Sequence, residues 1–389
     1  MIMLPAHADV VIVGGGPVGA LIALSARSAG RSVLVVEARP READVHDPRV
    51  LALSHASHEL LAAQGMWPDS LPATPIDTVH VSQQATFGRT VLNRRDLGLP
   101  HMGCTVAYAD LYASARAALL AAGVNVAFGA RAVSLRTTRC YATLGVSLAG
   151  KEQAVTARLV VLADGGSLVS ELPDIRYREH DYQQCAVLAR LHPELPHHQV
   201  AWERFSANGP MAVLPVGDDL MAVWTQSHAG AARLIELDDE AFVAEFAEAF
   251  GDRLGRLTAC GPRLAVPLKL RMASRIAGRR VALAGNAAQT MHPIAAQGLN
   301  LGLRDAAALA ALLARPGDPG EVARLDAYVE MRRIDALAVT GFTHSLAYLF
   351  DQHDPVRRAV RGAVMTVLDT LPMARRRFAE SMVFGVASR

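Results

Sequence analysis

The sequence has little net charge and few cysteines for its 389 residues. Its 39 basic and 37 acidic side chains leave a formal charge of +2, so bulk electrostatics argue against a nucleic-acid partner. The four cysteines are scattered without C-x-x-C spacing. This pattern indicates reduced, buried thiols and argues against a cysteine metal site. We therefore expect a cytoplasmic protein without a bound metal ion.

Long apolar runs are also missing. The stretch 10–26 carries no charge, but four glycines and a proline interrupt it, and it falls short of the roughly 20 residues of a membrane span. No basic segment precedes it, as a signal peptide would require. With 51% apolar and 20% charged residues, the chain has the composition of a well-packed protein. Its length predicts two intertwined domains.

The first fifty residues carry a nucleotide-binding pattern. A β-branched strand at 10–13 leads into a G-x-G-x-x-G turn, a helical stretch and a second strand at 32–36 that ends on an acid. The first glycine permits the tight turn, the second lets the backbone approach a pyrophosphate, and the third lets helix and strand pack closely. The helix N-terminus offers free amide donors. The dinucleotide-binding residues expected here are Gly14, Gly16, Val18, Gly19, Glu37 and Ala38.

This unit alone leaves NAD and FAD equally possible. A second passage, VALAGNAAQTMHPIAAQGLNLGLRD at 281–305, is less usual. Its apolar run stops at Gly285, and two amide side chains, Asn286 and Gln289, follow. The pair His292-Pro293 comes next, before a helical stretch that starts at 297.

Two further passages complete a recognisable set. Together with DPRVLALSHASHELLAAQGMW (47–67) and ARLVVLADGGS (157–167), the chain resembles the single-component FAD-dependent aromatic hydroxylases. It is more similar to the ubiquinone-biosynthesis hydroxylases, above all to the branch acting on 2-polyprenyl-6-methoxyphenol. The resemblance covers nearly the whole chain. It implies FAD as the cofactor, with NADPH or another compound as electron donor.

The resemblance also implies the fold class, which is α/β. A Rossmann-like FAD-binding domain (1–75, 103–178 and 270–330) would be interleaved with an antiparallel-sheet substrate domain (76–102 and 179–269). A C-terminal helical segment (331–389) would follow. Alternating stretches at 78–92, 184–193 and 199–226 independently predict antiparallel strands, with a hairpin turn at 217–219. The stretch 238–251 predicts an amphipathic helix that Gly251 ends.

Site residues are carried over by their match to the family's motifs. Arg49 matches an arginine near the cofactor phosphates, and Asp164-Gly165 matches the second cofactor fingerprint. Gly285 and Asn286 match the pair that holds the ribityl chain. The loop that borders the flavin ring is matched by Pro293, Gln297, Gly298, Leu299 and Asn300.

Several positions depart from the family's pattern. Leu168 stands where a serine is usual, Glu171 occupies a region that normally holds an arginine, and Tyr108 replaces an arginine. Asn286 replaces an aspartate, which removes one negative charge beside the flavin. These changes bear on nicotinamide contact more than on the FAD site.

The implied reaction is hydroxylation of the aromatic ring of a polyprenylated phenol with molecular oxygen, by way of a flavin hydroperoxide. We expect His292 as a candidate base and Pro293 as the wall above the reactive ring face, although a structural histidine is the alternative. The alternatives are another ring position or phenol, an NAD-dependent dehydrogenase, or a non-catalytic flavoprotein in a complex with other ubiquinone-biosynthesis proteins.

Apolar residues recur at helical spacing near the C-terminus, between Val356 and Leu371. Arg357, Arg358 and Arg361 lie off this stripe. The pattern predicts a helix packed over the body with a solvated basic face. The alternative is an interfacial helix that contacts the inner membrane face, where a polyprenyl substrate resides.

Overall fold

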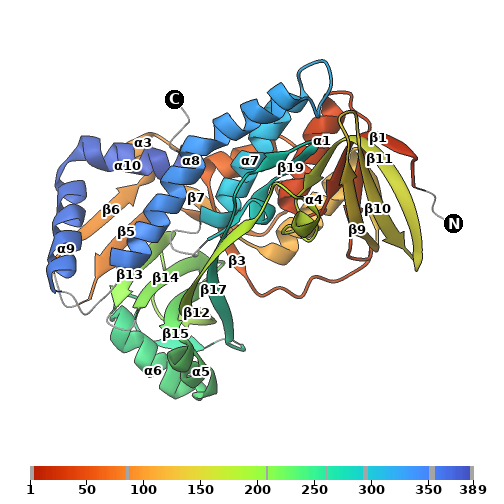
Figure 1. Cartoon of the computed structure of the whole chain (residues 1–389). Helices are drawn as coiled ribbons and strands as arrows, with labels where there is room; N and C mark the ends of the chain where they lie inside the picture. The colour runs from red at the N-terminus through yellow and green to blue at the C-terminus, as the bar shows by residue number, and fades with distance from the viewer. Residues whose placement is uncertain are drawn as a thin grey trace.

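The computed structural model describes residues 4–84, 87–206, 209–259, 261–291, 297–349 and 355–385. It combines an α/β layer built on a parallel sheet with a second, mostly antiparallel sheet and a group of C-terminal helices (Figure 1). This architecture confirms the predicted fold class. Among the described residues, no helix combines the length and the apolar character that crossing a membrane requires.

The first sheet is parallel at its centre, in the order β18-β19-β11-β1-β2-β8. Its four-residue run Val10–Val13 is buried on both faces, as a central parallel strand requires. Val10 and Ile12 pack against three helices, and Val11 and Val13 pack against an antiparallel pair on the other face. The strands of this layer are β1 (His7–Val13), β2 (Val33–Glu37), β8 (Asn125–Phe128), β9 (Ala130–Thr137), β10 (Ala142–Leu148), β11 (Lys151–Leu162), β18 (Ala277–Gly278) and β19 (Val281–Leu283). The helices are α1 (Pro17–Ser28), α4 (Tyr108–Ala121) and α7 (Gln297–Leu313).

The second sheet has the order β20-β17-β12-β15-β14-β13-β5-β6. Its members are β5 (Thr78–Gln83), β6 (Arg89–Asn93), β12 (Tyr177–Pro193), β13 (Val200–Ser206), β14 (Gly209–Val216), β15 (Asp219–Ser227), β17 (Leu264–Ala273) and β20 (Gln289–Thr290), with β16 (Leu257–Ala259) beside β12. The predicted strands and the hairpin at 217–219 are confirmed. The pairing along this sheet is antiparallel, as predicted, except that β13 and β5 pair in parallel. More than a hundred residues separate these two strands, so no hairpin imposes their direction.

Two helices cover the outer face of the second sheet. These are α5 (His228–Glu236) and α6 (Asp239–Phe250). The latter begins after the N-cap Asp238 and ends at Gly251, whose φ is +92°, so the predicted amphipathic helix is confirmed. Its phenylalanines pack with Trp202 and Trp224 of the sheet.

A small third sheet joins the two halves, in the order β3-β7-β4. Its strands are β3 (Val50–Ser54), β4 (Ala73–Ile76) and β7 (Gly103–Ala107), and α2 (His55–Ala62) and α3 (Arg94–Leu97) lie nearby in the chain. Short 3-10 turns, η1 (Val169–Glu171) and η2 (Gly285–Ala287), follow two strands of the first sheet.

The C-terminal helices run from the first layer to the far edge of the second sheet (Figure 1). They are α8 (Val322–Leu349), α9 (Pro355–Thr370) and α10 (Pro372–Phe384). The expected helices are present, but the expectation that Arg361 lies on a solvated face was wrong. Its Nε donates to Oε1 of Gln83 at 2.8 Å, its guanidinium lies 5.4 Å from the ring centroid of Phe205, and only 6% of the residue is exposed.

Candidate cofactor and substrate site

Two of the three predicted glycines are required by packing alone. Gly14 has a φ of +103°, and a Cβ there would lie 2.8 Å from the backbone of Ala163. A Cβ on Gly19 would lie 2.0 Å from the carbonyl oxygen of Gly14. Gly16 is different, because the nearest atom to its Cβ position is Oη of Tyr108 at 3.8 Å. The space in front of Gly16 therefore belongs to the cavity, as a site for a pyrophosphate requires.

The acid at the end of β2 is buried and held by backbone donors. Oε2 of Glu37 accepts from the amide of Gly15 at 2.6 Å, and Oε1 accepts from the amide of Arg39 at 2.9 Å. A carboxylate oxygen has two lone pairs, so each oxygen can accept another hydrogen bond. Glu37 and the adjoining Ala38 and Arg39 line the cavity, where ribose hydroxyls could supply the remaining donors.

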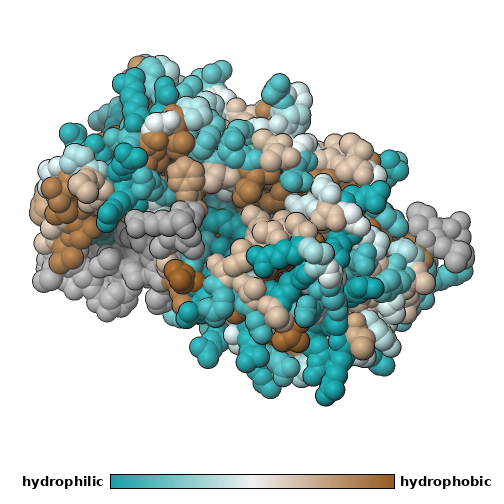
Figure 2. Space-filling model, turned by 90° about the horizontal axis from the view of Figure 1, so that it is seen from above, coloured by the Kyte–Doolittle hydropathy of each residue, from teal (hydrophilic) through white to brown (hydrophobic). Residues whose placement is uncertain are grey.

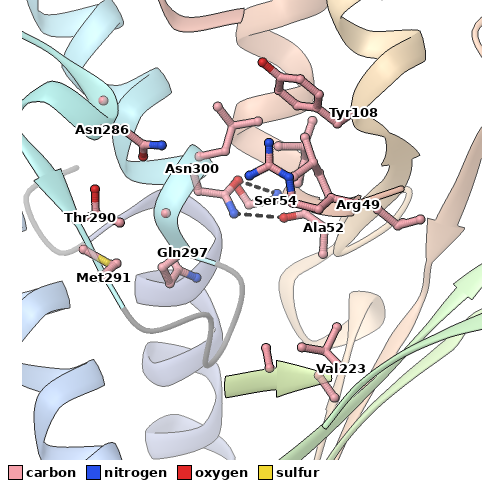
Figure 3. Close-up of a pocket in the computed structure, with 18 of the residues that line it drawn as sticks. Arg49, Ala52, Ser54, Tyr108, Val223, Asn286, Thr290, Met291, Gln297 and Asn300 are labelled. Atoms are coloured by element: carbon pink, nitrogen blue, oxygen red, sulfur yellow. Dashed lines mark hydrogen bonds between the residues drawn. The ribbon is translucent and has the colours of Figure 1, made fainter. Parts of the chain in front are cut away.

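Arg49 contributes a positive charge to the same end of the cavity. Its Nε donates to Oδ1 of Asp47 at 2.8 Å, and its guanidinium lies 4.9 Å from the ring centroid of Tyr108 (Figure 3). The hydrogen bond with Asp47 raises the pKa of Arg49. Tyr108 stands where the family has an arginine, and the guanidinium of Arg49 packs against the Tyr108 ring.

The second fingerprint forms a turn after β11. The carboxylate of Asp164 accepts from the amide of Gly166 at 2.9 Å and from the hydroxyl of Ser167. Gly165 has a φ of +90° and lines the cavity beside Asp164. Leu168, which departs from the family pattern, is buried in the core below the turn.

An arginine from a distant strand bonds to this turn. Arg271 of β17 donates from Nη2 to the carbonyl oxygens of Gly165 at 2.6 Å and Asn286 at 3.2 Å. Its guanidinium also lies 4.4 Å from the ring centroid of Tyr177. Arg271 therefore ties together the two turns expected to hold the cofactor. No local motif marked it, because it lies within an alternating strand.

The turn after β19 packs closely against two helices. Gly285 has a φ of +61°, and a Cβ there would lie 3.2 Å from a methyl group of Val18. A Cβ on Gly302 would lie 2.9 Å from Cα of Gly285. These close approaches leave the side chain of Asn286 directed into the cavity, beside the start of α7 (Figure 3). Asn286 can both donate to and accept from ribityl hydroxyls.

A buried network of ion pairs holds this turn against α7 and α8. The amide of Gly285 donates to Oδ2 of Asp305 at 3.0 Å, and Nε of Arg332 lies 2.7 Å from Oδ1 of the same carboxylate. Arg332 also pairs with Asp335 at 2.9 Å, and Asp335 pairs with Arg304 at 3.1 Å. The network includes two arginines and two aspartates, so its formal charges cancel. No local pattern in the sequence predicts this network, because its partners lie up to 31 residues apart.

The network reaches the first turn of α7. Nη2 of Arg304 donates to Oε1 of Gln297 at 3.0 Å. Gln297, Gly298, Leu299 and Asn300 all line the cavity. Asn300 is only 2% exposed; its Oδ1 accepts from the backbone amide of Ser54 at 2.9 Å, and its Nδ2 donates to the carbonyl oxygen of Ala52 at 3.1 Å (Figure 3). This side chain thus connects α7 to β3. His292 and Pro293 lie outside the described residues.

One large cavity of about 1490 Å³ connects these turns to the second sheet. Ligand pockets are typically about 300–1,000 Å³, so this cavity has room for more than one small ligand. The sheet side of its lining is largely apolar, with Val79, Val81, Leu92, Leu188, Leu214, Met221 and Val223, and its polar members include Thr90, Glu203 and Lys269. Its far end is lined by Val360, Val364 and Leu368 of α9 and by Phe378, Met382 and Val383 of α10.

A cluster of three histidines lies outside this cavity. Ring nitrogens of His55, His58 and His101 lie within 4.8 Å of one another. Three nitrogens bound to one Zn²⁺ at ~2.0–2.1 Å would be only about 3.4 Å apart, so the cluster would have to tighten to hold a metal. Burial lowers the pKa of both His55 and His101. The ring of His101 packs edge to face against the rings of His55 and His58.

Comparisons with known proteins agree with this geometry. Residues 7–343 match the family model described as FAD binding domain. The chain is 36% identical to ubiquinone hydroxylase UbiL of Rhodospirillum rubrum, over 95% of this chain and 88% of the relative. It is 33% identical to 3-demethoxyubiquinol 3-hydroxylase of Escherichia coli, over 80% of this chain and 81% of the relative.

The fold agrees as well. The solved structure of p-nitrophenol 4-monooxygenase PnpA from Pseudomonas putida has a TM-score of 0.78 and 18% identity, over 98% of this chain and 99% of that one. The open space at Gly16, the buried acid Glu37 and the turn at Gly285 together fit a long dinucleotide held at both ends. The chain therefore belongs to the FAD-binding domain family, among the ubiquinone-biosynthesis hydroxylases, and its cofactor is FAD.

Proposed function

We propose that the protein hydroxylates the aromatic ring of a polyprenylated phenol in ubiquinone biosynthesis, with molecular oxygen as co-substrate. The observation that carries this proposal is the single cavity that runs from the FAD turns to the apolar face of the second sheet. Two relatives are named as a ubiquinone hydroxylase and a 3-demethoxyubiquinol 3-hydroxylase, and these names support the same substrate class.

Different residues along the cavity would bind different parts of FAD. Gly16, Glu37 and Arg49 would hold the adenosine and phosphate half of FAD, and Asn286 would hold the ribityl chain. Backbone donors at Gln297 and Gly298, in the first turn of α7, would face the flavin ring, with Pro293 beside it. Bound FAD supplies the oxygen-transfer chemistry, and the apolar sheet positions the ring and excludes water.

The C-terminal helices offer a path for the prenyl tail. Val360 and Val364 line the cavity and are also about half exposed, at 49% and 53%, so the cavity lining continues onto the surface here. Leu371 and Met373 extend the exposed apolar surface, at 53% and 74%. Apolar side chains gather at the end of the molecule formed by these helices (Figure 2). We propose that this surface touches the inner membrane face, where the substrate resides.

Three further points belong to the proposal. The division between the first and second sheets supports the ranges predicted for the FAD-binding and substrate parts, except that β20 and the end of β17 belong to the second sheet and lie within 270–330. NADPH is the proposed electron donor, and other proteins of ubiquinone biosynthesis are proposed partners. A candidate role for His292 in deprotonating the phenol is retained as a proposal from the sequence.

The test is anaerobic reduction of purified FAD-bound protein, followed by mixing with oxygen and a short-chain prenylated phenol. We expect a product heavier by one oxygen atom, labelled when ¹⁸O₂ is used. Binding of the phenol without hydroxylation, whatever the reductant, would favour a non-catalytic flavoprotein. Liposome co-sedimentation of Val364→Asp and Met373→Asp variants against wild type tests the membrane contact separately.

A further inference from the structure

Glu203 stands out on the face of the second sheet that lines the cavity. It lies on β13, directly opposite Val81 of β5 and Ala212 of β14. The same row of cross-strand neighbours continues through Val223 of β15 and Leu188 of β12. All of these side chains line the cavity, and Glu203 is the carboxylic acid among them.

The carboxyl group of Glu203 is not used by the fold. It makes no hydrogen bond or ion pair with any residue in the part of the chain that the structure describes. The next residue, Arg204, points to the opposite face, where its Nε donates to the carbonyl of Ala249 at 2.9 Å. Arg361 of α9 also lines the cavity, but it bonds to Gln83. Burial among apolar side chains raises the pKa of Glu203 to about 8.

An unpaired acid in an apolar cavity costs stability, so its presence needs a functional explanation. Neighbouring strands are ~4.8 Å apart, which puts Glu203 about 10 Å from Val223. Val223 faces the start of α7 across the cavity (Figure 3). A carboxyl group here can accept a hydrogen bond from a ligand, and in its neutral form it can also donate one.

We propose that Glu203 binds the hydroxyl group of the phenol substrate and so selects a phenol over an analogue without a free hydroxyl, an inference that rests on the proposed function. The immediate cross-strand neighbours of Glu203, Val81 and Ala212, offer the hydroxyl no side-chain acceptor, and Thr90 lies one strand further along the row. Removing either partner leaves the other buried and unpaired, so recognition depends on both.

The experiment crosses a change in the ligand with a change in the residue. A short-chain prenylated phenol and its methyl ether are titrated into FAD-bound wild type, and binding is read from the visible absorbance of the flavin. The wild type should bind the phenol about tenfold tighter than the ether. In Glu203→Leu the two should bind within about twofold, whereas Glu203→Gln should keep most of the preference, because its amide oxygen can accept.

Thr90→Val is the matched control, because Thr90 lines the cavity in the same row, opposite Val81. It should retain the preference for the phenol. In the wild type, the ratio of the affinities for the phenol and the ether should also change near pH 8. This change should be absent in Glu203→Gln. The charged side chains of Arg361 on α9 and Lys269 on β17 also line the cavity.

Equal binding of phenol and ether to the wild type would overturn the inference, and so would a preference that survives in Glu203→Leu. Both outcomes leave the hydroxylase proposal intact if the phenol is still hydroxylated. If the wild type neither binds nor hydroxylates the phenol, the proposed function fails instead. Should Glu203→Leu not retain FAD, the pH comparison between wild type and Glu203→Gln still decides.

Discussion

The glycines of the nucleotide turn are needed for different reasons, some for folding and one for ligand binding. Gly14 and Gly19 are required by contacts within the chain, whereas the position of a Cβ on Gly16 is open to the cavity. The backbone of Gly16 has φ −68° and ψ 177°, which any residue adopts. The motif therefore combines glycines that the fold requires with a glycine that leaves space for the ligand.

Gly16→Val should accordingly fold but fail to hold FAD. We expect its apo form to unfold within about 0.5 kcal/mol of wild type, while FAD titration shows an affinity at least 100-fold weaker. Gly19→Ala is the comparison, because its Cβ would meet the Gly14 carbonyl at 2.0 Å and should lower the stability of the apo form itself. Wild-type affinity in Gly16→Val would contradict the assigned pyrophosphate position.

Glu203 should reduce stability at high pH, since its raised pKa of about 8 lies above the ordinary value for glutamate. Between the two values the unfolded chain is ionised and the folded chain is not. The contribution of a neutral Glu203 to the free energy of unfolding is therefore fully present below about pH 4.5 and is lost as the pH rises to about 8. Glu203→Gln should be more stable than wild type by about 1–3 kcal/mol at pH 8, with little difference at pH 5.

Urea unfolding of both proteins at the two pH values tests this expectation. Glu152→Gln is the control, because Glu152 is exposed on β11. The control should show the same difference from wild type at both pH values. A destabilised Glu203→Gln at pH 8 would mean that the carboxyl group has a structural partner.

Among the secondary-structure elements, α7 and α8 are held to the Gly285 turn by the ion network of Asp305, Arg332, Asp335 and Arg304. Removing one member of a buried network leaves its partners uncompensated. The same change loosens the turn that is proposed to hold the ribityl chain. Stability and FAD affinity should therefore fall together.

Arg332→Met should lower the free energy of unfolding by about 3–5 kcal/mol and weaken FAD binding. The adjacent Arg333→Met is the control, because Arg333 pairs with Glu330 on the surface at 3.1 Å and both side chains are more than half exposed. That change should cost less than about 1 kcal/mol. Chemical unfolding and FAD titration of the two variants measure both effects. Similar losses of stability and FAD affinity in the two variants would show that the buried network stabilises the protein no more than a surface ion pair does.

The contact between α2 and the start of β7 should respond to acid. Burial lowers the pKa of His55 and His101 below the usual 6.5, so the folded protein keeps them neutral where the unfolded chain takes up protons. Stability should therefore fall as the pH drops from about 6.5. Thermal unfolding of a His55→Gln, His101→Gln double variant should show a smaller loss between pH 7 and pH 5 than wild type. The exposed His46→Gln should follow the wild type.

At the scale of the whole molecule, the two halves share one cavity, so occupancy of the substrate end should affect the FAD end. The altered residues Leu168 and Glu171 follow the second fingerprint, and we expect weak binding of a nicotinamide donor there. Stopped-flow mixing with NADPH should bleach the flavin slowly, and a prenylated phenol should speed this step about tenfold or more. A rate independent of the phenol would show that substrate binding and reduction are not coupled.

The sequence by itself determined the nucleotide-binding unit, the predicted strands and helix α6. These follow from periodicity, turn chemistry and motif spacing, all of which act between residues near one another in the chain. The family, the cofactor FAD and the predicted role of Gly285 were inferred from the resemblance of the quoted motifs, because the spacing of Gly14 and Glu37 alone left NAD and FAD equally possible. The proposed roles of His292 and Pro293 remain predictions.

Tertiary structure alone decided which side chains from distant segments meet. Arg271 donates to the carbonyl of Gly165, which lies 106 residues earlier in the chain, and Arg361 turns inward to Gln83, 278 residues away. Glu203 became notable only when apolar residues of neighbouring strands surrounded it. β13 and β5 pair in parallel for a similar reason, since strand order is set by packing across the sheet. Local sequence patterns do not predict such contacts, because the contacting residues are brought together only when the whole chain folds.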